Sequence, residues 1–386
     1  MILQKIDKVI LNKTFSLSRF SKIECLLKAN DYDRLKNILI KNNIEIINEY
    51  LFINSFRVKI DLKQIERLSN MSQVKFISSV SSVQTLMNVS KKILNVSNTQ
   101  LSGKGVGIAF IDTGVKNHCD FILGQNRIKF FKDFINDKAF AYDDNGHGTF
   151  VCGVCCGNGS LSKGKFSGVA PQSHIVSLKA LNSQGEASAD KILDAMQWVY
   201  DNHKQYNIRI VCMSFGSEPL GYNDPIMAGA EALWREGLVV VAAAGNSGPE
   251  NQTIKSPGVS SQIITVGGFC DNRFENSEYN ENFFEIADFS SRGPAFSRFK
   301  PDVVAPSVDI ISCGINSDYV TLSGTSVATP MIAGICALIL QEASYLKPSE
   351  VKKYLISCCK PISLNKNFEG FGYPDFESLI KRKNMK

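Results

Sequence analysis

The chain has 386 residues, of which 44% are hydrophobic and 21% charged, and its formal net charge is +6. These values are typical of globular proteins and exclude an intrinsically disordered chain, and the length allows one large and one small domain. Basic residues are dense only at positions 381–386, so we expect a solvated tail and no nucleic-acid partner.

The N-terminal twenty residues lack the pattern of an export signal. Lys5, Asp7, Lys8 and Lys13 interrupt the stretch where a continuous apolar run would be required. The eleven cysteines are odd in number, which does not fit a disulfide framework in a chain of this length. We therefore expect a cytoplasmic protein with reduced thiols and no membrane partner, although export by a non-classical route stays open.

Residues 1–82 have the pattern of a small unit of their own. Strand-like stretches occur at 22–28, 45–54, 56–60 and 74–80, and amphipathic helical stretches at 32–41 and 62–69. This β-α-β-β-α-β order predicts a small α+β sandwich of the ferredoxin-like kind. Residues 83–102 are rich in Ser, Asn, Val and Lys, which indicates an accessible linker.

Residues 103–386 have a different pattern, in which short apolar strands alternate with helices. The strands are 106–111, 175–178, 208–213, 238–243 and 263–266, and the helices are 189–200, 225–235 and 329–343. Strands that are apolar on both faces predict an α/β fold, with a parallel sheet between two helical layers. In such sheets the chemistry lies beyond the carboxyl ends of the strands. The apolar run 331–340 is too short to cross a bilayer and indicates a buried helix.

Four polar residues stand beside glycines at the ends of these elements. Asp112 follows the first strand, and His147 opens a helical stretch; alone, these two are more typical of a turn cap and a structural histidine. Ser326 precedes the last helix, where Pro330 is expected in the first turn, and a helix N-cap is an equal alternative for this serine. Asn246 follows a buried strand, where its amide can donate to an oxyanion.

Together these residues, in the order Asp, His, Ser, resemble the subtilisin (subtilase) family of serine proteases. The matching stretches are IDTG (111–114), HGTFVCG (147–153), GVAP (168–171), MSFG (213–216), AAAGN (242–246), FSSRGP (289–294), KPDVVAP (300–306) and GTSVATPMIAG (324–334). The α/β-hydrolase alternative requires a GxSxG elbow, and none surrounds Ser326.

The resemblance implies a subtilisin-like three-layer fold and a serine endopeptidase. Asp112 would orient His147, which would take the proton from Ser326, and Ser326 would attack the scissile carbonyl. The backbone N–H of Ser326 and the side chain of Asn246 would bind the oxyanion. Val327, Phe150 and Cys152 replace the Met, His and Ala usual in the family, and none of these changes removes a catalytic atom.

An extended peptide would bind as a strand between the edge 214–216 and the stretch 179–185. The implied substrate-binding residues are Ser214, Phe215, Gly216, Ala244, Gly245 and Lys255. Lys255 stands near the floor of the primary pocket, where glycine is usual. Its ammonium would either enter the pocket and favour acidic or polar side chains, or turn outward into water and leave an apolar preference.

The N-terminal unit resembles the inhibitory prodomain of the family, so we expect a zymogen inhibited by its own N-terminal unit. Self-cleavage is expected between about residues 83 and 90, after Leu86 or Met87. Two alternatives of another kind stay open: a regulatory protein that keeps the fold without turnover, and an enzyme that its N-terminal unit keeps permanently latent.

No metal site and no required cofactor are expected. Cys152, Cys155 and Cys156 lack the paired spacing of a zinc site. The long loop that builds a tight calcium site in secreted members is not found at 157–168, so only weak calcium binding stays open.

Overall fold

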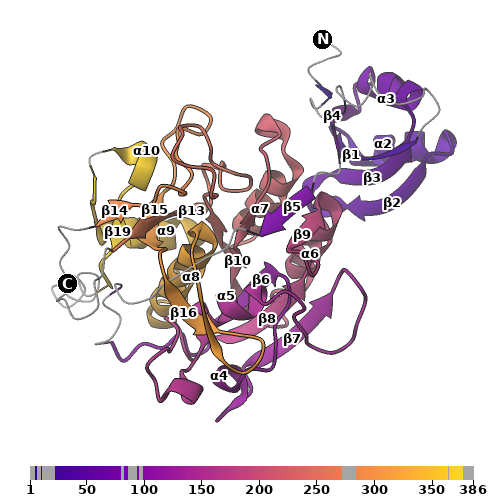
Figure 1. Cartoon of the computed structure of the whole chain (residues 1–386). Helices are drawn as coiled ribbons and strands as arrows, with labels where there is room; N and C mark the ends of the chain where they lie inside the picture. Colours follow the sequence, from indigo (N-terminus) through magenta and orange to yellow (C-terminus); the bar gives the residue numbers. More distant parts are fainter. Residues whose placement is uncertain are drawn as a thin grey trace.

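The computed structural model describes residues 5, 6, 10, 22–79, 82–85, 94, 99–271, 284–363 and 365–376. These residues form two units, a small N-terminal one and a larger one built on an eight-stranded sheet (Figure 1). The predicted division at residues 82 and 103 stays a prediction.

The N-terminal unit is an antiparallel four-stranded sheet with the order β2-β3-β1-β4. Its elements are β1 (Ile23–Ala29), α2 (Tyr32–Lys41), β2 (Glu45–Tyr50), η2 (Leu51–Ile53), β3 (Ser55–Ile60), α3 (Leu62–Ser69) and β4 (Val74–Ser79). Side-chain caps fix where the helices begin: Asp31 accepts from the N–H of Arg34, and Asp61 forms a capping box with Gln64. The strand predicted to reach residue 54 ends at Tyr50, because a 3₁₀ turn follows and Asn54 has a left-handed backbone.

The larger unit is an α/β fold whose sheet has the order β14-β13-β12-β10-β6-β8-β7, with β15 also paired to β13. The sheet strands are β6 (Gly107–Asp112), β7 (Ile128–Asp133), β8 (His174–Lys179), β10 (Ile208–Met213), β12 (Val239–Ala243), β13 (Ile264–Cys270), β14 (Glu285–Ile286) and β15 (Val303–Pro306). The helices are α4 (Cys119–Ile122), α5 (His147–Cys156), α6 (Ala189–Asn202), α7 (Pro225–Arg235), α8 (Thr325–Glu342), α9 (Pro348–Ser357) and α10 (Lys366–Glu369), with 3₁₀ turns η3 (Ser160–Ser162) and η4 (Gly221–Asn223). Short strands outside the sheet are β5 (Ser82–Thr85), β9 (Glu186–Ser188), β11 (Phe215–Gly216), β16 (Ile310–Cys313), β17 (Tyr319–Leu322), β18 (Cys359–Lys360) and β19 (Tyr373–Pro374).

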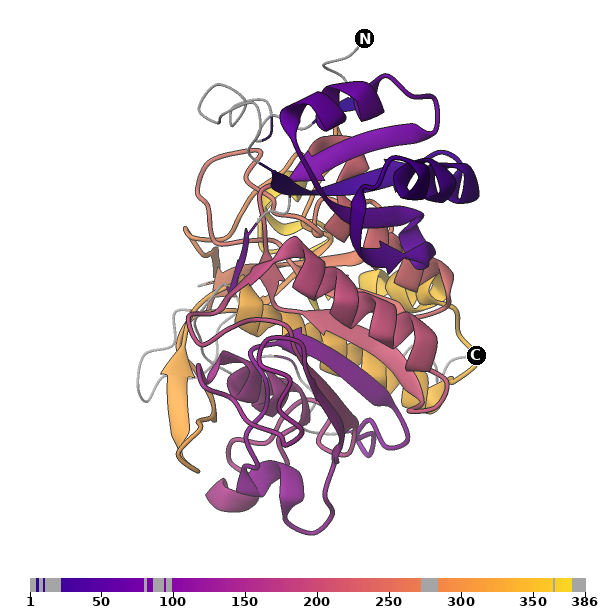
Figure 2. The ribbon, with the colours of Figure 1, turned by 90° about the vertical axis from the view of Figure 1, so that its right-hand side faces the viewer.

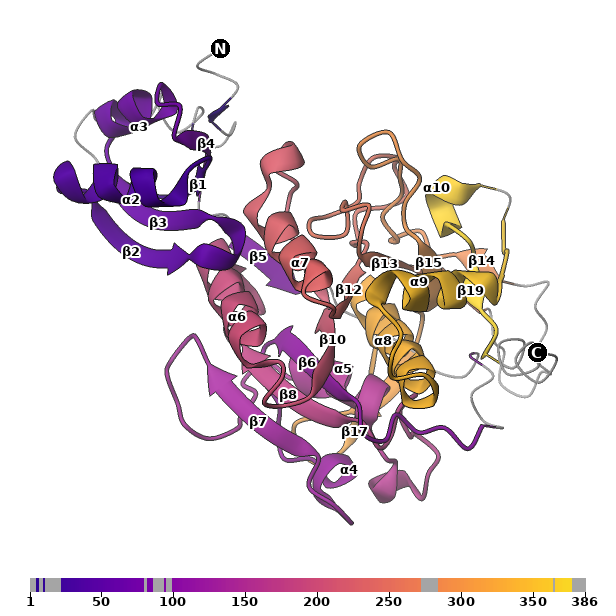
Figure 3. The same ribbon diagram turned by 180° about the vertical axis from the view of Figure 1, so that it is seen from behind.

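Both faces of the sheet are buried, which confirms the three-layer prediction. Along β6, Ile108 and Phe110 pack with α5 and α8, whereas Ala109 and Ile111 pack with α6 and α7. Figure 3 shows the sheet between these two helical layers. The expectation of a purely parallel sheet is wrong at one edge, because β14 pairs antiparallel with β13. A two-residue strand is too short for its apolar pattern to be recognised.

Helix α8 begins at Thr325, four residues earlier than predicted, and Pro330 lies inside it. The expectation that Pro330 occupies the first turn is therefore wrong. Since proline lacks an N–H, it cannot donate to the carbonyl of Ser326, four residues earlier. Among the helices of the described ranges, α8 alone has the length and hydropathy of a membrane span, and 89% of that span is buried inside the fold.

The N-terminal unit packs on α6 and α7 (Figure 2). Leu26, Tyr50 and Ile53 are buried in one cluster with the side chains of these helices. The amide of Asn48 donates to Asp194 at 2.8 Å, and Arg57 forms an ion pair with the buried Asp190.

Candidate active site

Asp112 and His147 form a hydrogen-bonded pair. Asp112 is the last residue of β6, His147 is the first of α5, and their side chains are almost fully buried. The Nδ1 atom of His147 lies 2.8 Å from Oδ1 of Asp112. Because a carboxylate can only accept, Nδ1 carries the proton, and Nε2 of a neutral imidazole is then the basic nitrogen.

Thr113 and Asp143, which are not among the predicted site residues, hold the loop that carries His147. Asp143 accepts from the hydroxyl of Thr113 at 2.9 Å and from the N–H of Gly146 at 2.8 Å. The Thr113 hydroxyl in turn accepts from the N–H of Gly148 at 2.8 Å. A Cβ on Gly148 would lie 2.2 Å from the carbonyl oxygen of Gly114, which explains the glycine after His147.

Ser326 is the second residue of α8 and is fully buried. Gly324 occupies the N-cap position, so the N-cap alternative for Ser326 is wrong. Within the described residues its Oγ has no hydrogen-bond partner. At this position in a helix the backbone N–H also has no intrahelical acceptor. Among the described residues, neither group is therefore engaged by the protein.

Asn246 is oriented by Thr325. Its Oδ1 accepts from the backbone N–H of Thr325 at 2.9 Å and from the Thr325 hydroxyl at 3.0 Å. Since a backbone N–H can only donate, the atom that faces it must be the amide oxygen. The Nδ2 group therefore points away from Thr325 and is left to donate.

Sheet order brings these residues to one edge. Asp112 ends β6 and Asn246 follows β12, and both strands are parallel neighbours of β10. Neighbouring strands lie about 4.8 Å apart, so the ends of β6 and β12 are about two strand spacings apart at the carboxyl edge. This is the predicted place for the chemistry.

The predicted substrate edge is already paired with a segment of the chain itself. Thr85 and Gln84 of β5 pair antiparallel with Phe215 and Gly216 of β11, beside Ser214. On its other side β5 pairs with β9, not with the predicted stretch 179–185. That stretch turns back on itself, with the N–H of Gly185 donating to the carbonyl of Asn182 at 3.0 Å.

Lys255 lies against Ala244 and Gly245, and its ammonium pairs with an acidic side chain that neither predicted course included. The N–H of Lys255 donates to the carbonyl of Ala244 at 2.8 Å, and its Cγ lies beside the α-carbon of Gly245. The side chain is 15% exposed, and its ammonium forms an ion pair with the exposed Glu218.

One buried cluster has the residue types of a metal site: His118, Asp120 and Cys313. Protein donors already occupy it, because Asp120 accepts from the hydroxyl of Tyr319 at 2.8 Å and from two backbone N–H groups at 3.0 and 3.1 Å. The imidazole Nδ1 of His118 accepts from the N–H of Asp120. The cluster is therefore explained as a hydrogen-bond network.

The eleven cysteines, all in described ranges, form no disulfide with one another, and eight of them are buried. Burial raises the pKa of the Cys152 and Cys155 thiols well above the usual value. They are therefore neutral core side chains.

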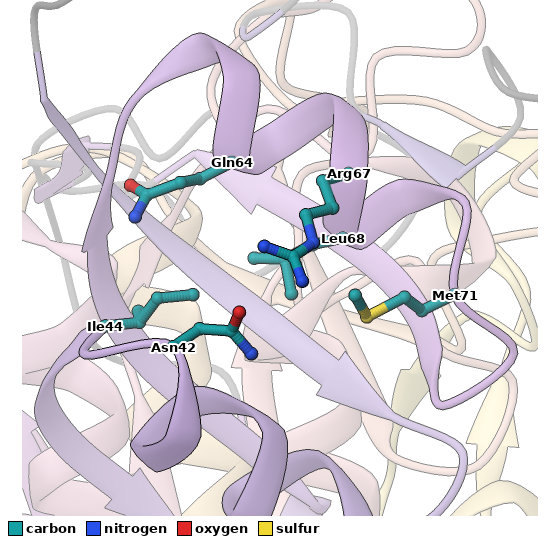
Figure 4. Close-up of a pocket in the computed structure, with 6 residues that line it drawn as sticks. All are labelled: Asn42, Ile44, Gln64, Arg67, Leu68 and Met71. Atoms are coloured by element: carbon teal, nitrogen blue, oxygen red, sulfur yellow. The ribbon is translucent and has the colours of Figure 1, made fainter.

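A small surface pocket in the N-terminal unit, between the ends of α2 and α3, is remote from the predicted site residues (Figure 4). It is lined by Asn42, Ile44, Gln64, Arg67, Leu68 and Met71.

A mostly parallel sheet between two helical layers, with Asp, His, Ser and Asn at its carboxyl edge, defines a subtilisin-like α/β protein. A family model described as the subtilase family matches residues 103–373. The chain belongs to this family.

Known proteins agree with this assignment. Serine protease AprX of Bacillus subtilis is 42% identical over 281 residues, which cover 66% of this chain and 61% of AprX, so the chain spans about three-fifths of that relative's length. A cold adapted subtilisin-like serine proteinase of known structure has 30% identity and a TM-score of 0.57, covering 72% of this chain and 89% of its own. Fervidolysin from Fervidobacterium pennivorans, at 20% identity, shares the fold with a TM-score of 0.74 and covers 97% of this chain and 62% of its own.

Proposed function

We propose that the protein is a serine endopeptidase that hydrolyses peptide bonds in peptide or protein substrates. The observation that carries the proposal is the 2.8 Å hydrogen bond from His147 to Asp112 at the edge where Ser326, the second residue of α8, has a hydroxyl without a partner among the described residues. Membership of the subtilase family supports it. All four expected residues are present, which disfavours a regulatory protein without turnover.

Each group would contribute one step. His147, oriented by Asp112, takes the proton of Ser326 as its Oγ attacks the scissile carbonyl, and later gives this proton to the leaving amine. The backbone N–H of Ser326 and the Nδ2 of Asn246 donate to the oxyanion. A fluorophosphonate probe tests the proposal: it should label Ser326 in the mature enzyme, and a properly folded protein that stays unlabelled would favour the non-catalytic alternative. We propose no required cofactor and at most weak calcium binding.

We further propose that the N-terminal unit is a ferredoxin-like prodomain that inhibits the enzyme. Its strand order and two helices support this fold. Strand β5 supports the inhibition, since it occupies the edge of β11 on which a substrate strand would add. The alternative of a permanently latent enzyme differs from this proposal only in that the N-terminal unit is never removed.

The zymogen proposal predicts a cut after Leu86 or Met87, which lie outside the described residues. The mature chain should begin at Met87 or Asn88, because the segment just before the cut, β5, already pairs with the proposed substrate edge β11. N-terminal sequencing and intact mass of the purified enzyme measure this. A mature N-terminus beyond Gly105 would contradict it, since the lead-in to β6 would be lost, and a chain that stays whole would favour the latent enzyme.

We also expect Lys255 and Glu218 to restrict the primary pocket together. Replacing Lys255 with glycine should improve cleavage after Phe relative to Leu by about tenfold, because the buried aliphatic stem of Lys255 no longer fills space in the primary pocket. Glu218→Gln should improve cleavage after Glu, because the ammonium loses its counter-charge. Matched peptides with Glu, Leu or Phe before the scissile bond measure both effects. The same ranking in the parent and Lys255→Gly would exclude Lys255 as a specificity residue.

A further inference from the structure

A buried lysine that the proposed mechanism does not use lies beside the candidate triad. Lys179 ends β8, and its side chain has no exposed surface. In the register of the parallel pair, Lys179 lies opposite Asp112 of β6. Residues opposite each other in a parallel pair point to the same face of the sheet, so the Lys179 side chain lies on the face where Asp112 meets His147.

The ammonium of Lys179 joins three segments. It donates to the carbonyl of Thr113 at 2.7 Å, to the carbonyl of Leu181 at 2.9 Å and to the carboxylate of Asp144 at 2.6 Å. Thr113 directly follows Asp112, and Asp144 lies three residues before His147. A single cation therefore connects the segment of the aspartate, the loop of the histidine and the turn after β8.

The charges around the pair are few. Among the described residues, the charged groups besides Asp112 that hydrogen-bond to the segments carrying it and His147 include Asp143, Asp144 and Lys179. Two thiols of the same core, on α5 and β10, are Cys152 and Cys212, and burial raises the pKa of both. They are uncharged at neutral pH, so Lys179 is the single cation among these groups.

We propose that Lys179 and Asp144 form a positioning pair that fixes Asp112 against His147 and sets the proton affinity of His147. The ammonium acts through hydrogen bonds on the backbone of the Asp112 segment and the His147 loop, and through its charge on the imidazolium. The Asp144 carboxylate, which is 35% exposed, offsets part of that charge. The role of this positioning pair in catalysis rests on the proposed endopeptidase function.

The two members of the pair should shift the titration of His147 in opposite directions. Lys179→Met removes a cation and should raise the midpoint by about half a pH unit to one pH unit, whereas Asp144→Asn should lower it by a similar amount. The double variant should return close to the parent. NMR of histidine-labelled protein in the Ser326→Ala background measures this, because the chain has only four histidines and His147→Gln assigns the signal.

A merely structural role for Lys179 predicts something else: a shift in the same direction for both variants, or no shift, and either result overturns the proposal. If Lys179→Met does not fold, Asp144→Asn keeps the test decisive. Asp144 is partly exposed, so this variant should fold, and the midpoint of His147 in it must fall. The NMR measurement requires no turnover. Absence of proteolysis in the Ser326 parent would therefore overturn the proposed function without deciding this inference. In an active parent, the acid limb of the kcat/KM profile should follow the NMR midpoints.

Discussion

Ser326→Ala should abolish peptide hydrolysis and self-cleavage while leaving the fold intact. The nucleophile and the proton that His147 would accept are lost together, so the expected decrease in kcat is about a millionfold, the magnitude known for the catalytic serine of the related subtilisin. Stability should not fall, because the buried hydroxyl of Ser326 has no hydrogen-bond partner among the described residues. Removing an unpartnered buried polar group is neutral or stabilising by about 1 kcal/mol.

Ser323→Ala is the matched control for this variant. Ser323 is half-buried in the same loop, just before the N-cap Gly324, and is expected to keep full activity and processing. Peptide hydrolysis, intact mass and thermal melting of the two variants separate loss of the nucleophile from damage to the loop. If purified Ser326→Ala still processed itself by an intramolecular cut, the assignment of Ser326 would be wrong.

Local patterns were sufficient to predict the elements that position the site. Ile208–Met213 and Pro225–Arg235 form the predicted strand and helix with the same bounds. A polar residue that ends an apolar strand, such as Asp112, is visible in the sequence because the parallel sheet is buried on both faces. Order along the chain does not reveal which strands are neighbours, so it could not place Asp112 and Asn246 on either side of β10.

Contacts between distant residues were beyond these patterns. Lys179 resembles any lysine at the end of a strand, and its bonds to Thr113 and Asp144 exist only in the folded sheet. The pairing of Lys255 with Glu218 was missed for the same reason, because a long flexible side chain can reach many partners. The start of α8 at Thr325 was missed because Pro330 is usually taken as a first-turn residue.

Asn246→Ala should lower kcat by about a hundredfold to a thousandfold and change KM little. This is the magnitude known for the oxyanion donor of subtilisin. The physical reason is that the Nδ2 of Asn246 meets full negative charge only near the transition state, so its removal affects kcat more than binding. Steady-state kinetics normalised by fluorophosphonate titration measure this, since titration counts only folded, reactive sites.

Two further variants separate the donor of Asn246 from its anchor. Asn246→Asp keeps an oxygen toward the N–H and hydroxyl of Thr325 but replaces the donor with a carboxylate, so it should lower kcat more than alanine does, because the new charge repels the oxyanion. Thr325→Ala removes the hydroxyl, which donates to Asn246 and accepts from the N–H of Gly245, and leaves Nδ2 in place. It should therefore lower kcat by about tenfold, in line with the loss of two neutral hydrogen bonds. If Asn246→Ala and Thr325→Ala lowered kcat equally, Asn246 would act only by ordering the start of α8, and an unchanged kcat in Asn246→Ala would remove it from the mechanism.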